Sequence, residues 1–270
     1  MPATDNELVD AGARDLLVNA VREAGTLALK AFRGTIKQWA KGRSSVVCEI
    51  DLAVDELLHE RLTGSGSAYA WLSEETEDDP VRLNAKTVWI VDPIDGTRSY
   101  LAGRVDWAVS AALAIDGRPE VAALFAPATE EFFFATAGGG ATLNGVPIAA
   151  NSTTSPVGAK VAGPKQFLKR LAETNTKVVP MPRIGSLALR LARVAQGELD
   201  IAFAGTNSHD WDLAAADLLV HEAGGALTTL AGQVLTYNCP EPVHGALIAA
   251  GQNCHATVIE RTRTWRANPA

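Results

Sequence analysis

The chain has 270 residues, 47% of them hydrophobic, and a formal net charge of −7. That length and hydrophobic content suffice for one domain or for two closely joined lobes. The acidic balance argues against nucleic-acid binding through a basic surface, whereas a small anionic substrate is not excluded, because bound metal ions supply local positive charge.

The N-terminal quarter of the chain predicts helices and short strands that lead to a run of acidic residues. Small and aliphatic side chains recur at helical spacing first, and the pattern changes after a glycine. In chain order we expect a helix over 5–33 ended by Gly34, a strand over 36–39, a basic loop over 41–45, a helix from Asp51 to the turn at 64–67, and a strand over 69–73. The acidic run 74–79 follows. Such a run is either a solvated loop or a second strand end that presents carboxylates.

The central stretch is an apolar run, 88–91, that leads into two aspartates, Asp92 and Asp95. The run predicts a fully buried strand. Two carboxylates so close together repel unless a cation or a proton intervenes, which favours a hard divalent metal held by oxygen ligands. Turn chemistry alone is the simpler interpretation, since Asp-Pro and Asp-Gly pairs are common in turns. A phosphatase nucleophile of the D-x-D-G-T type is rejected, because two residues separate the aspartates.

The rest of the chain predicts two lobes, an N-terminal α+β lobe over 1–150 and a C-terminal α/β lobe over 151–270. Strands are expected over 107–115, 120–125 and 131–136, with a bend or hairpin at the glycines 138–140. In the second half we expect strands over 160–163, 177–179, 199–203, 226–230 and 246–250, and helices over 166–174, 185–196 and 211–222, followed by a last helix. This order favours an α/β fold of stacked helices and mixed sheets, a layered sandwich.

Asp212 opens the predicted helix over 211–222. An aspartate at that place is first of all a good N-cap. The partly positive helix N-terminus also tolerates a carboxylate there. Placed beside Asp92 and Asp95, Asp212 would complete an oxygen-rich cage.

Three motifs in this order resemble the inositol monophosphatase superfamily over about residues 10–255. The first is Trp89-Ile90-Val91-Asp92-Pro93-Ile94-Asp95-Gly96-Thr97. The second is Trp211-Asp212-Leu213-Ala214-Ala215 with Glu222-Ala223-Gly224-Gly225, and Ser73-Glu74-Glu75 precedes the first at the family's spacing. Asp51 matches a further acidic position.

The resemblance implies an α-β-α-β-α sandwich, usually a homodimer, that hydrolyses small phosphate monoesters with two or three Mg²⁺ ions and is inhibited by Li⁺. Carried over to this chain, the metal ligands would be Glu74, Asp92, Asp95, Asp212 and the Ile94 carbonyl. Asp51 and Thr97 would orient and activate the attacking water as catalytic residues. Substrate would contact Glu74, Asp95, Gly96, Thr97, Gly185, Ser186 and Asp212, with the Gly96 and Thr97 N–H groups on the phosphate.

The substrate is predicted from departures within the family. Inositol-specific members carry a glutamate six residues before the Trp-Asp pair, where this chain has Gly205. The segments 72–76 and 235–238 look like bacterial 3'(2'),5'-bisphosphate nucleotidases, so adenosine 3',5'-bisphosphate is the expected substrate. Gly163-Pro164-Lys165 and Cys48 depart from that pattern. Lys165 either grips the second phosphate or is a solvated lysine.

Other substrates and another class stay open at this point. Inositol 1-phosphate and histidinol phosphate are the alternative substrates, and a non-catalytic regulatory protein that binds metal or a partner is the alternative class. The polar, acidic start of the chain is unlike a signal peptide. No run of about 18 apolar residues predicts a membrane span, and three scattered cysteines are typical of free thiols in a reducing compartment. We therefore expect a cytoplasmic protein.

Overall fold

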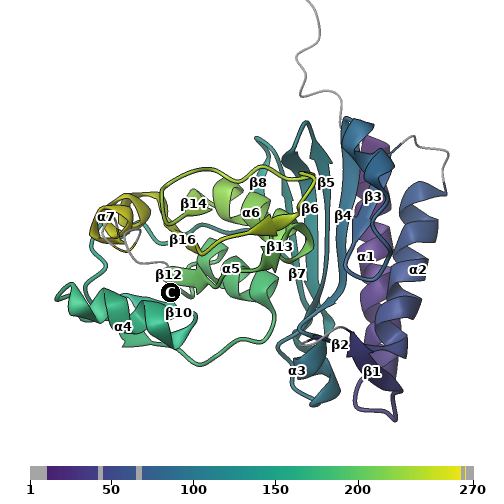
Figure 1. Cartoon of the computed structure of the whole chain (residues 1–270), viewed down its shortest axis with the longest axis horizontal. Coiled ribbons are helices and arrows are strands. Elements are labelled where there is room, and N and C mark those ends of the chain that lie inside the picture. The colour runs from purple at the N-terminus through teal and green to yellow at the C-terminus, as the bar shows by residue number, and fades with distance from the viewer. Residues whose placement is uncertain (1–10, 42–44, 65–68, 263–264, 266–270) are drawn as a thin grey trace, which may run out of the picture.

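The computed structural model describes residues 11–41, 45–64, 69–262 and 265, and these form five stacked layers. Figure 1 shows the order from right to left: a helix pair, a sheet, a second helix pair, a second sheet and a third helix pair. This arrangement confirms the predicted layered α/β sandwich with mixed sheets. The helix pairs are α1 (Ala11–Ala31) with α2 (Glu49–Thr63), α5 (Leu187–Ala195) with α6 (Asp210–Glu222), and α4 (Lys165–Glu173) with α7 (Gln252–Thr262).

The larger sheet has seven strands in the order β3-β4-β5-β6-β7-β8-β9. The β3–β4 pair in it is parallel, and the other neighbouring strands are antiparallel. The strands are β3 (Ala70–Ser73), β4 (Thr87–Asp95), β5 (Ala108–Ile115), β6 (Arg118–Ala126), β7 (Glu131–Thr136), β8 (Gly140–Leu143) and β9 (Val146–Pro147).

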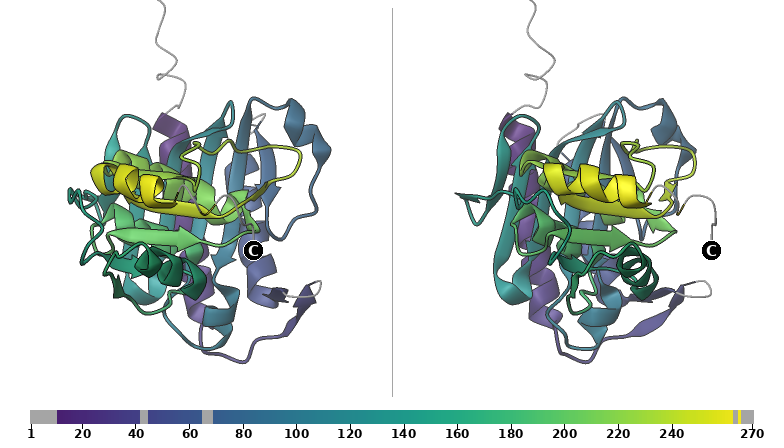
Figure 2. Two further views of the ribbon diagram at one scale, coloured as in Figure 1. Left: turned by 60° about the vertical axis from the view of Figure 1, so that its left-hand side comes forward. Right: turned by 90° about the vertical axis from the view of Figure 1, so that its left-hand side faces the viewer.

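The smaller sheet has five strands in the order β11-β10-β12-β16-β14, and α4 and α7 cover its outer face (Figure 2). Strand β10 is parallel to both neighbours, whereas β16 is antiparallel to both of its own. The strands are β10 (Lys160–Ala162), β11 (Val179–Pro180), β12 (Ile201–Ala204), β14 (Gly225–Thr229) and β16 (Leu247–Gly251). Two small two-stranded sheets lie outside these two sheets: β1 (Gln38–Lys41) with β2 (Ser45–Cys48), and β13 (Ser208–His209) with β15 (Val243–His244).

Strand β4 contributes to two separate hydrophobic cores. Trp89 and Val91 pack in the core beneath α1 and α2, whereas Val88 and Ile90 pack in the core shared with α5 and α6. Successive side chains of a strand point to opposite faces, so a strand covered on both faces must be apolar at every position. This explains the continuous apolar run and confirms the predicted buried strand. A third core joins the smaller sheet to α4 and α7.

The structure departs from the predicted elements at the end of one strand and at several short elements. Strand β4 continues through Asp95, although the prediction ended it before Asp92. Strand β2, the one-turn helix α3 (Thr97–Leu101) and strands β8 and β9 were not predicted. The 3₁₀ turns η2 (Pro80–Asn84) and η3 (Pro127–Thr129) were also missed. These short elements carry too few residues for a periodic pattern.

Other predictions agree with the structure or fall outside it. The hairpin at 138–140 is confirmed, because β7 pairs with β8 across it. The predicted helix start at 5–10, the loop residues 42–44 and the turn residues 65–67 lie outside the described residues. The division of the chain at residue 150 stays a prediction. In the described part of the chain, no helix has the length and apolar character needed to cross a bilayer.

Candidate active site

A β-bulge at the end of β4 places Asp92 and Asp95 on one side of the strand. Asp92 pairs with Ser110 and Asp95 with Ala108, so β4 advances three residues where β5 advances two. In a regular strand, residues three apart point to opposite faces. The extra residue of a bulge shifts that alternation by one, and both carboxylates therefore reach the same space.

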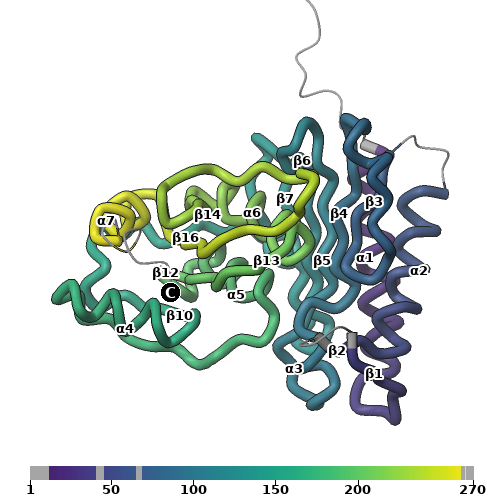
Figure 3. The backbone as a smooth tube through the Cα atoms, viewed as in Figure 1, coloured from purple at the N-terminus to yellow at the C-terminus, as the bar shows by residue number. Residues whose placement is uncertain are grey.

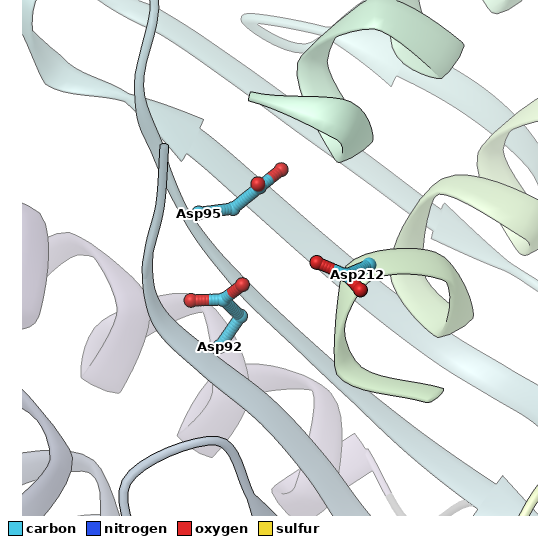
Figure 4. Close-up of side chains that lie close together, drawn as sticks. All are labelled: Asp92, Asp95 and Asp212. Atoms are coloured by element: carbon cyan, nitrogen blue, oxygen red, sulfur yellow. The ribbon is translucent and has the colours of Figure 1, made fainter. Parts of the chain in front are cut away.

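Asp212 joins these two aspartates from the opposite layer. Carboxylate oxygens of Asp92, Asp95 and Asp212 all lie within 4.8 Å of one another. Figure 4 shows Asp92 and Asp95 on one strand, with Asp212 facing them from the start of α6. The structure thus brings together three of the four predicted acidic metal ligands. The first and last of them, Asp92 and Asp212, are 120 residues apart in the sequence.

Asp212 is the third residue of α6 and not its N-cap. The helix begins at Asp210, with His209 as N-cap, and Asp212 Oδ2 accepts the His209 N–H at 2.6 Å. This reciprocal capping box holds the carboxylate in place through one oxygen. The prediction that Asp212 is the N-cap residue is therefore wrong, although its carboxylate does help to cap the helix from the third position.

Asp95 is held by the N-terminus of α5. Its Oδ2 accepts bonds from the Ser186 hydroxyl and the Ala188 N–H, both at 2.6 Å, and its Oδ1 accepts the Leu187 N–H at 3.1 Å. Ser186 also caps α5, because its Oγ accepts the Leu189 N–H at 2.9 Å. The segment that leads into α5 thereby comes against the lower end of the larger sheet, as the backbone trace shows (Figure 3).

Glu74 follows β3 directly, and β3 lies beside β4. Its N–H donates to Val91 O at 3.2 Å, which places it next to Asp92 across the strand pair. The two strand ends therefore meet, as their position in the sequence suggested. The rest of the acidic run is a solvated surface turn, in which Asp78 pairs with Arg82.

The pKa values of the aspartates on β4 are raised, because burial and neighbouring carboxylates make their charged forms less stable. Burial, followed by the charges of Glu74, Asp95 and Asp212, raises the pKa of Asp92 well above its ordinary value. Burial and the charge of Asp212 raise the pKa of Asp95 to about 7, against the opposing effect of its three hydrogen bonds. Asp92 Oδ1 is buried with no hydrogen-bond partner among the described residues. A buried carboxylate oxygen of this kind needs a cation or a proton.

The donor set fits a hard divalent cation. It consists of carboxylate oxygens only, two of the three carboxylates are buried, and one oxygen lacks a partner within the described ranges. Mg²⁺ binds through a few carboxylates and keeps several waters. The site opens into a cavity, which leaves room for such waters and for a substrate oxygen.

Asp51 and Thr97 form a second, connected unit behind the carboxylates. Asp51 is the third residue of α2, is 1% exposed, and accepts the Cys48 N–H at 2.7 Å. The Thr97 hydroxyl lies 3.1 Å from both Asp51 Oδ1 and the Ile94 carbonyl oxygen. Burial raises the pKa of Asp51, and the hydrogen bonds from Cys48 and Thr97 counteract it. Thr97 lines the cavity, whereas Asp51 and Ile94 do not.

Two glycines allow the first turn of α3 to approach the N-terminus of α5. Gly96 has a φ of +96°, and a Cβ atom there would lie 3.1 Å from Asp106 O and from Ser186 N. A Cβ on Gly185 would lie 2.0 Å from Ser99 Oγ. A side chain at either position would force the two segments apart.

The cavity has a volume of about 360 Å³ and carries charge of both signs. Its lining residues are Val46, Glu74, Asp92, Asp95, Gly96, Thr97, Arg98, Ser99, Ala102, Arg104, Arg183, Gly185 and Asp212. The sequence prediction missed the three arginines. Arg98 directly follows the first motif and could have been found by its position, whereas Arg104 and Arg183 carry no local signal. Lys165, at the start of α4, does not line the cavity.

The fold is a five-layered α/β sandwich, and an acidic cavity lies between its strand ends and helix N-termini. These two features are typical of metal-dependent enzymes that act on small molecules. The comparison with known families then assigns the chain to one of them. A sequence model of the inositol monophosphatase family matches residues 11–265. The chain belongs to the inositol monophosphatase family, a family of metal-dependent phosphatases.

Individual relatives agree with this assignment. The chain is 33% identical over 259 residues to an inositol-1-monophosphatase of Caulobacter vibrioides, covering 87% of this chain and 98% of that protein. It is 32% identical over 229 residues to the Nus factor SuhB of Escherichia coli, covering 81% and 85%. The crystal structure of the extragenic suppressor protein suhB from Bartonella henselae superimposes with a TM-score of 0.81 at 25% identity, covering 93% and 98%.

Proposed function

We propose that this protein is a Mg²⁺-dependent hydrolase of a small phosphate monoester. The observation that carries the proposal is the convergence of Asp92, Asp95 and Asp212 within 4.8 Å, with one buried carboxylate oxygen that has no partner in the described chain. Such a cluster is costly in a folded protein unless a cation compensates it. Because the chain belongs to a phosphatase family, we infer that the bound cation takes part in phosphate-ester hydrolysis.

Glu74, Asp92, Asp95 and Asp212 are the side chains that would hold Mg²⁺, with the Ile94 carbonyl as a further ligand. When bound there, Mg²⁺ supplies positive charge that offsets the phosphate and lowers the pKa of a bound water. The chain itself fixes the geometry of the ligands. The bulge in β4, the N-terminus of α5 and the capping box of α6 each hold one carboxylate in place.

Thr97 and Asp51 would orient the attacking water. Thr97 lines the cavity and its hydroxyl lies within donating distance of Asp51 Oδ1, so the hydroxyl oxygen can accept a proton from water while its own proton goes to Asp51. Because burial raises the pKa of Asp51, its carboxylate is a better proton acceptor than an exposed aspartate. The proton then passes from water through Thr97 to Asp51 as the new phosphorus–oxygen bond forms and the bond from phosphorus to the ester oxygen breaks. The leaving alkoxide takes its proton from a solvent water, so that the products are inorganic phosphate and the free alcohol.

The phosphate would rest against the backbone at Gly96 and Thr97. Both residues line the cavity, and the positive φ of Gly96 turns the chain sharply at that point. Backbone N–H groups in such a turn bind anions. Gly185 completes this wall, because its N–H donates to Asp106 Oδ2 at 2.6 Å and fixes the α5 segment there. Ser186, which the sequence analysis placed against the substrate, is buried outside the cavity lining and instead holds Asp95.

Adenosine 3',5'-bisphosphate is our proposed substrate, and inositol 1-phosphate is the second candidate. Gly205 supplies no side-chain partner for a sugar hydroxyl, which disfavours inositol recognition. The arginines of the cavity favour a substrate with additional negative charge. Inositol 1-phosphate is favoured by the names of the Caulobacter and Dictyostelium relatives, an inositol-1-monophosphatase and an inositol monophosphatase.

The test is phosphate release by the purified protein from a panel of monoesters. The panel holds adenosine 3',5'-bisphosphate, inositol 1-phosphate, fructose 1,6-bisphosphate and histidinol phosphate. We expect turnover with Mg²⁺, none after chelation, and inhibition by Li⁺. Turnover that persists in excess chelator would contradict metal dependence. A complete lack of turnover with every ester would favour the regulatory class, since one group of relatives is named Nus factor.

The homodimer implied by the family is part of the same proposal. Light scattering on the eluting peak of a size-exclusion column measures the mass directly, and a mass near 28.4 kDa would contradict it.

A further inference from the structure

The cavity is divided by charge into two parts, and the second part has no role in the mechanism above. Its acidic part consists of Glu74, Asp92, Asp95 and Asp212. Its basic part, here called the arginine rim, consists of Arg98, Arg104 and Arg183. All three arginines are exposed, whereas Asp92 and Asp95 are buried. The rim comes from α3, from the connection between α3 and β5, and from the connection to α5.

Arg104 and Arg183 are held next to each other. The Arg104 guanidinium forms a bidentate ion pair with Asp106, at 2.9 and 2.5 Å, and its NH2 also lies 3.4 Å from the Arg183 carbonyl oxygen. Asp106 in turn accepts the Gly185 N–H. The buried side of this segment is fixed by Arg190, which donates to the Ile184 carbonyl oxygen at 2.9 Å. The rim is therefore built into the fold at the same junction that positions Asp95.

Two arginines of the rim, Arg104 and Arg183, differ in how their charge is neutralised. Asp106 is paired with Arg104, and the guanidinium of Arg183 forms no hydrogen bond or ion pair with any residue in the described ranges. Arg190 adds a further cation, and its pKa is lowered by burial and by the nearby charge of Arg183. The charges of Arg183 and Arg190 thus affect each other, and neighbouring guanidinium groups favour an anion beside them.

We propose that the arginine rim binds a second anionic group of the substrate, a phosphate or a carboxylate that is not hydrolysed. This inference rests on the proposed function, because the metal and the backbone at Gly96 and Thr97 would already hold the reacting phosphate. A guanidinium fork matches the oxygen pairs of phosphate and carboxylate. A neutral polyol gains little from such a rim, and a cationic substrate such as histidinol phosphate is repelled by it.

The test uses two pairs of substrates that differ in the second group alone. Adenosine 3',5'-bisphosphate is compared with adenosine 3'-monophosphate, and 3-phosphoglycerate with glycerol 1-phosphate. The purified full-length protein is assayed with Mg²⁺ as wild type and as Arg183→Gln, Arg183→Lys and Arg14→Gln. Arg14 is an exposed arginine on α1, outside the cavity lining, and serves as the matched control.

We expect the wild type to prefer the member with the second anion in at least one pair. Arg183→Gln should lower kcat/KM for that member about tenfold or more, mainly through KM, and for its partner by less than about twofold. Arg183→Lys should fall in between, because it keeps the charge and loses the fork. The pair that responds identifies the group as phosphate or carboxylate.

Two results would overturn the inference while leaving the proposed function intact. One is a wild type that hydrolyses the member without the second anion equally well or better in both pairs. The other is an Arg183→Gln variant that changes both members of each pair by the same factor. No Mg²⁺-dependent phosphate release from any substrate would instead remove the proposed function, and the inference with it.

Discussion

The two parts of the cavity differ in how they are supported. The acidic residues lie at the ends of strands and in the first turn of a helix, and backbone N–H groups hold the carboxylates of Asp95 and Asp212. The arginines of the rim lie on a one-turn helix and on connections, and their side chains are exposed. Connections tolerate change better than the elements they join. We therefore expect substitutions in the acidic part to affect hydrolysis itself, and substitutions in the rim to affect which ester is preferred.

The largest effect is expected from Asp92→Asn. Loss of this carboxylate should lower kcat about 1,000-fold or more, because metal-bound charge stabilisation contributes several kcal/mol. The fold should survive, since the neutral amide removes a buried charge that burial and neighbouring acids disfavour. Phosphate release and the thermal midpoint measure the two effects. Asp15→Asn, an exposed aspartate on α1, is the control. Wild-type turnover in Asp92→Asn would remove Asp92 from the metal site.

A smaller loss is expected from Thr97→Val. The substitution keeps the shape of the side chain and removes the hydroxyl that contacts Asp51 and Ile94. Loss of an oriented proton acceptor should lower kcat about 100-fold, while the rise in thermal midpoint on adding Mg²⁺ persists. Thr97→Ser restores the hydroxyl and should recover most of the activity. If Thr97→Ser is as impaired as Thr97→Val, the hydroxyl is not the functional group.

The acidic part, unlike the rim, should make Mg²⁺ binding depend on pH. The pKa of Asp95 is raised to about 7 in the metal-free protein, so below that pH a proton must leave before the cation binds. Because the folded pKa lies above the ordinary value, protonation is favoured as pH falls and metal affinity falls with it. Calorimetry should find binding about tenfold weaker at pH 6 than at pH 8. Equal affinities at both pH values would show that no proton is displaced.

The smallest effect is expected from Asp55→Asn, which weakens a support of the acidic part. Asp55 on α2 accepts hydrogen bonds from the hydroxyls of Ser73 at 2.5 Å and Thr76 at 2.6 Å, on either side of Glu74. The amide can accept at one atom only, so one hydroxyl loses the acceptor for its proton, at a cost of about 1 kcal/mol. The thermal midpoint should fall by about 2–4 °C. Glu56→Gln, on the exposed side of α2, should leave it unchanged.

Much of the fold was predictable because long apolar periodicities survive in the structure. The order of helices and strands and the layered sandwich follow from those patterns. The short elements did not follow, because β2, α3, β8 and β9 depend on contacts with distant residues. Strand β4 ran past its predicted end for the same reason: Asp92 and Asp95 pair with β5, and turn-like residues became part of a strand.

The candidate site shows the same division. The sequence by itself pointed to Asp92, Asp95 and Asp212, the three acidic residues that the structure brings together, since their motifs are local. Only the tertiary structure decided that a bulge turns Asp92 and Asp95 to one side, that Asp212 serves as the third residue of a capping box, and that Arg104 and Arg183 meet across the same cavity. The physical reason is that a motif records neighbours along the chain, whereas charge repulsion, metal coordination and anion binding depend on distances in space.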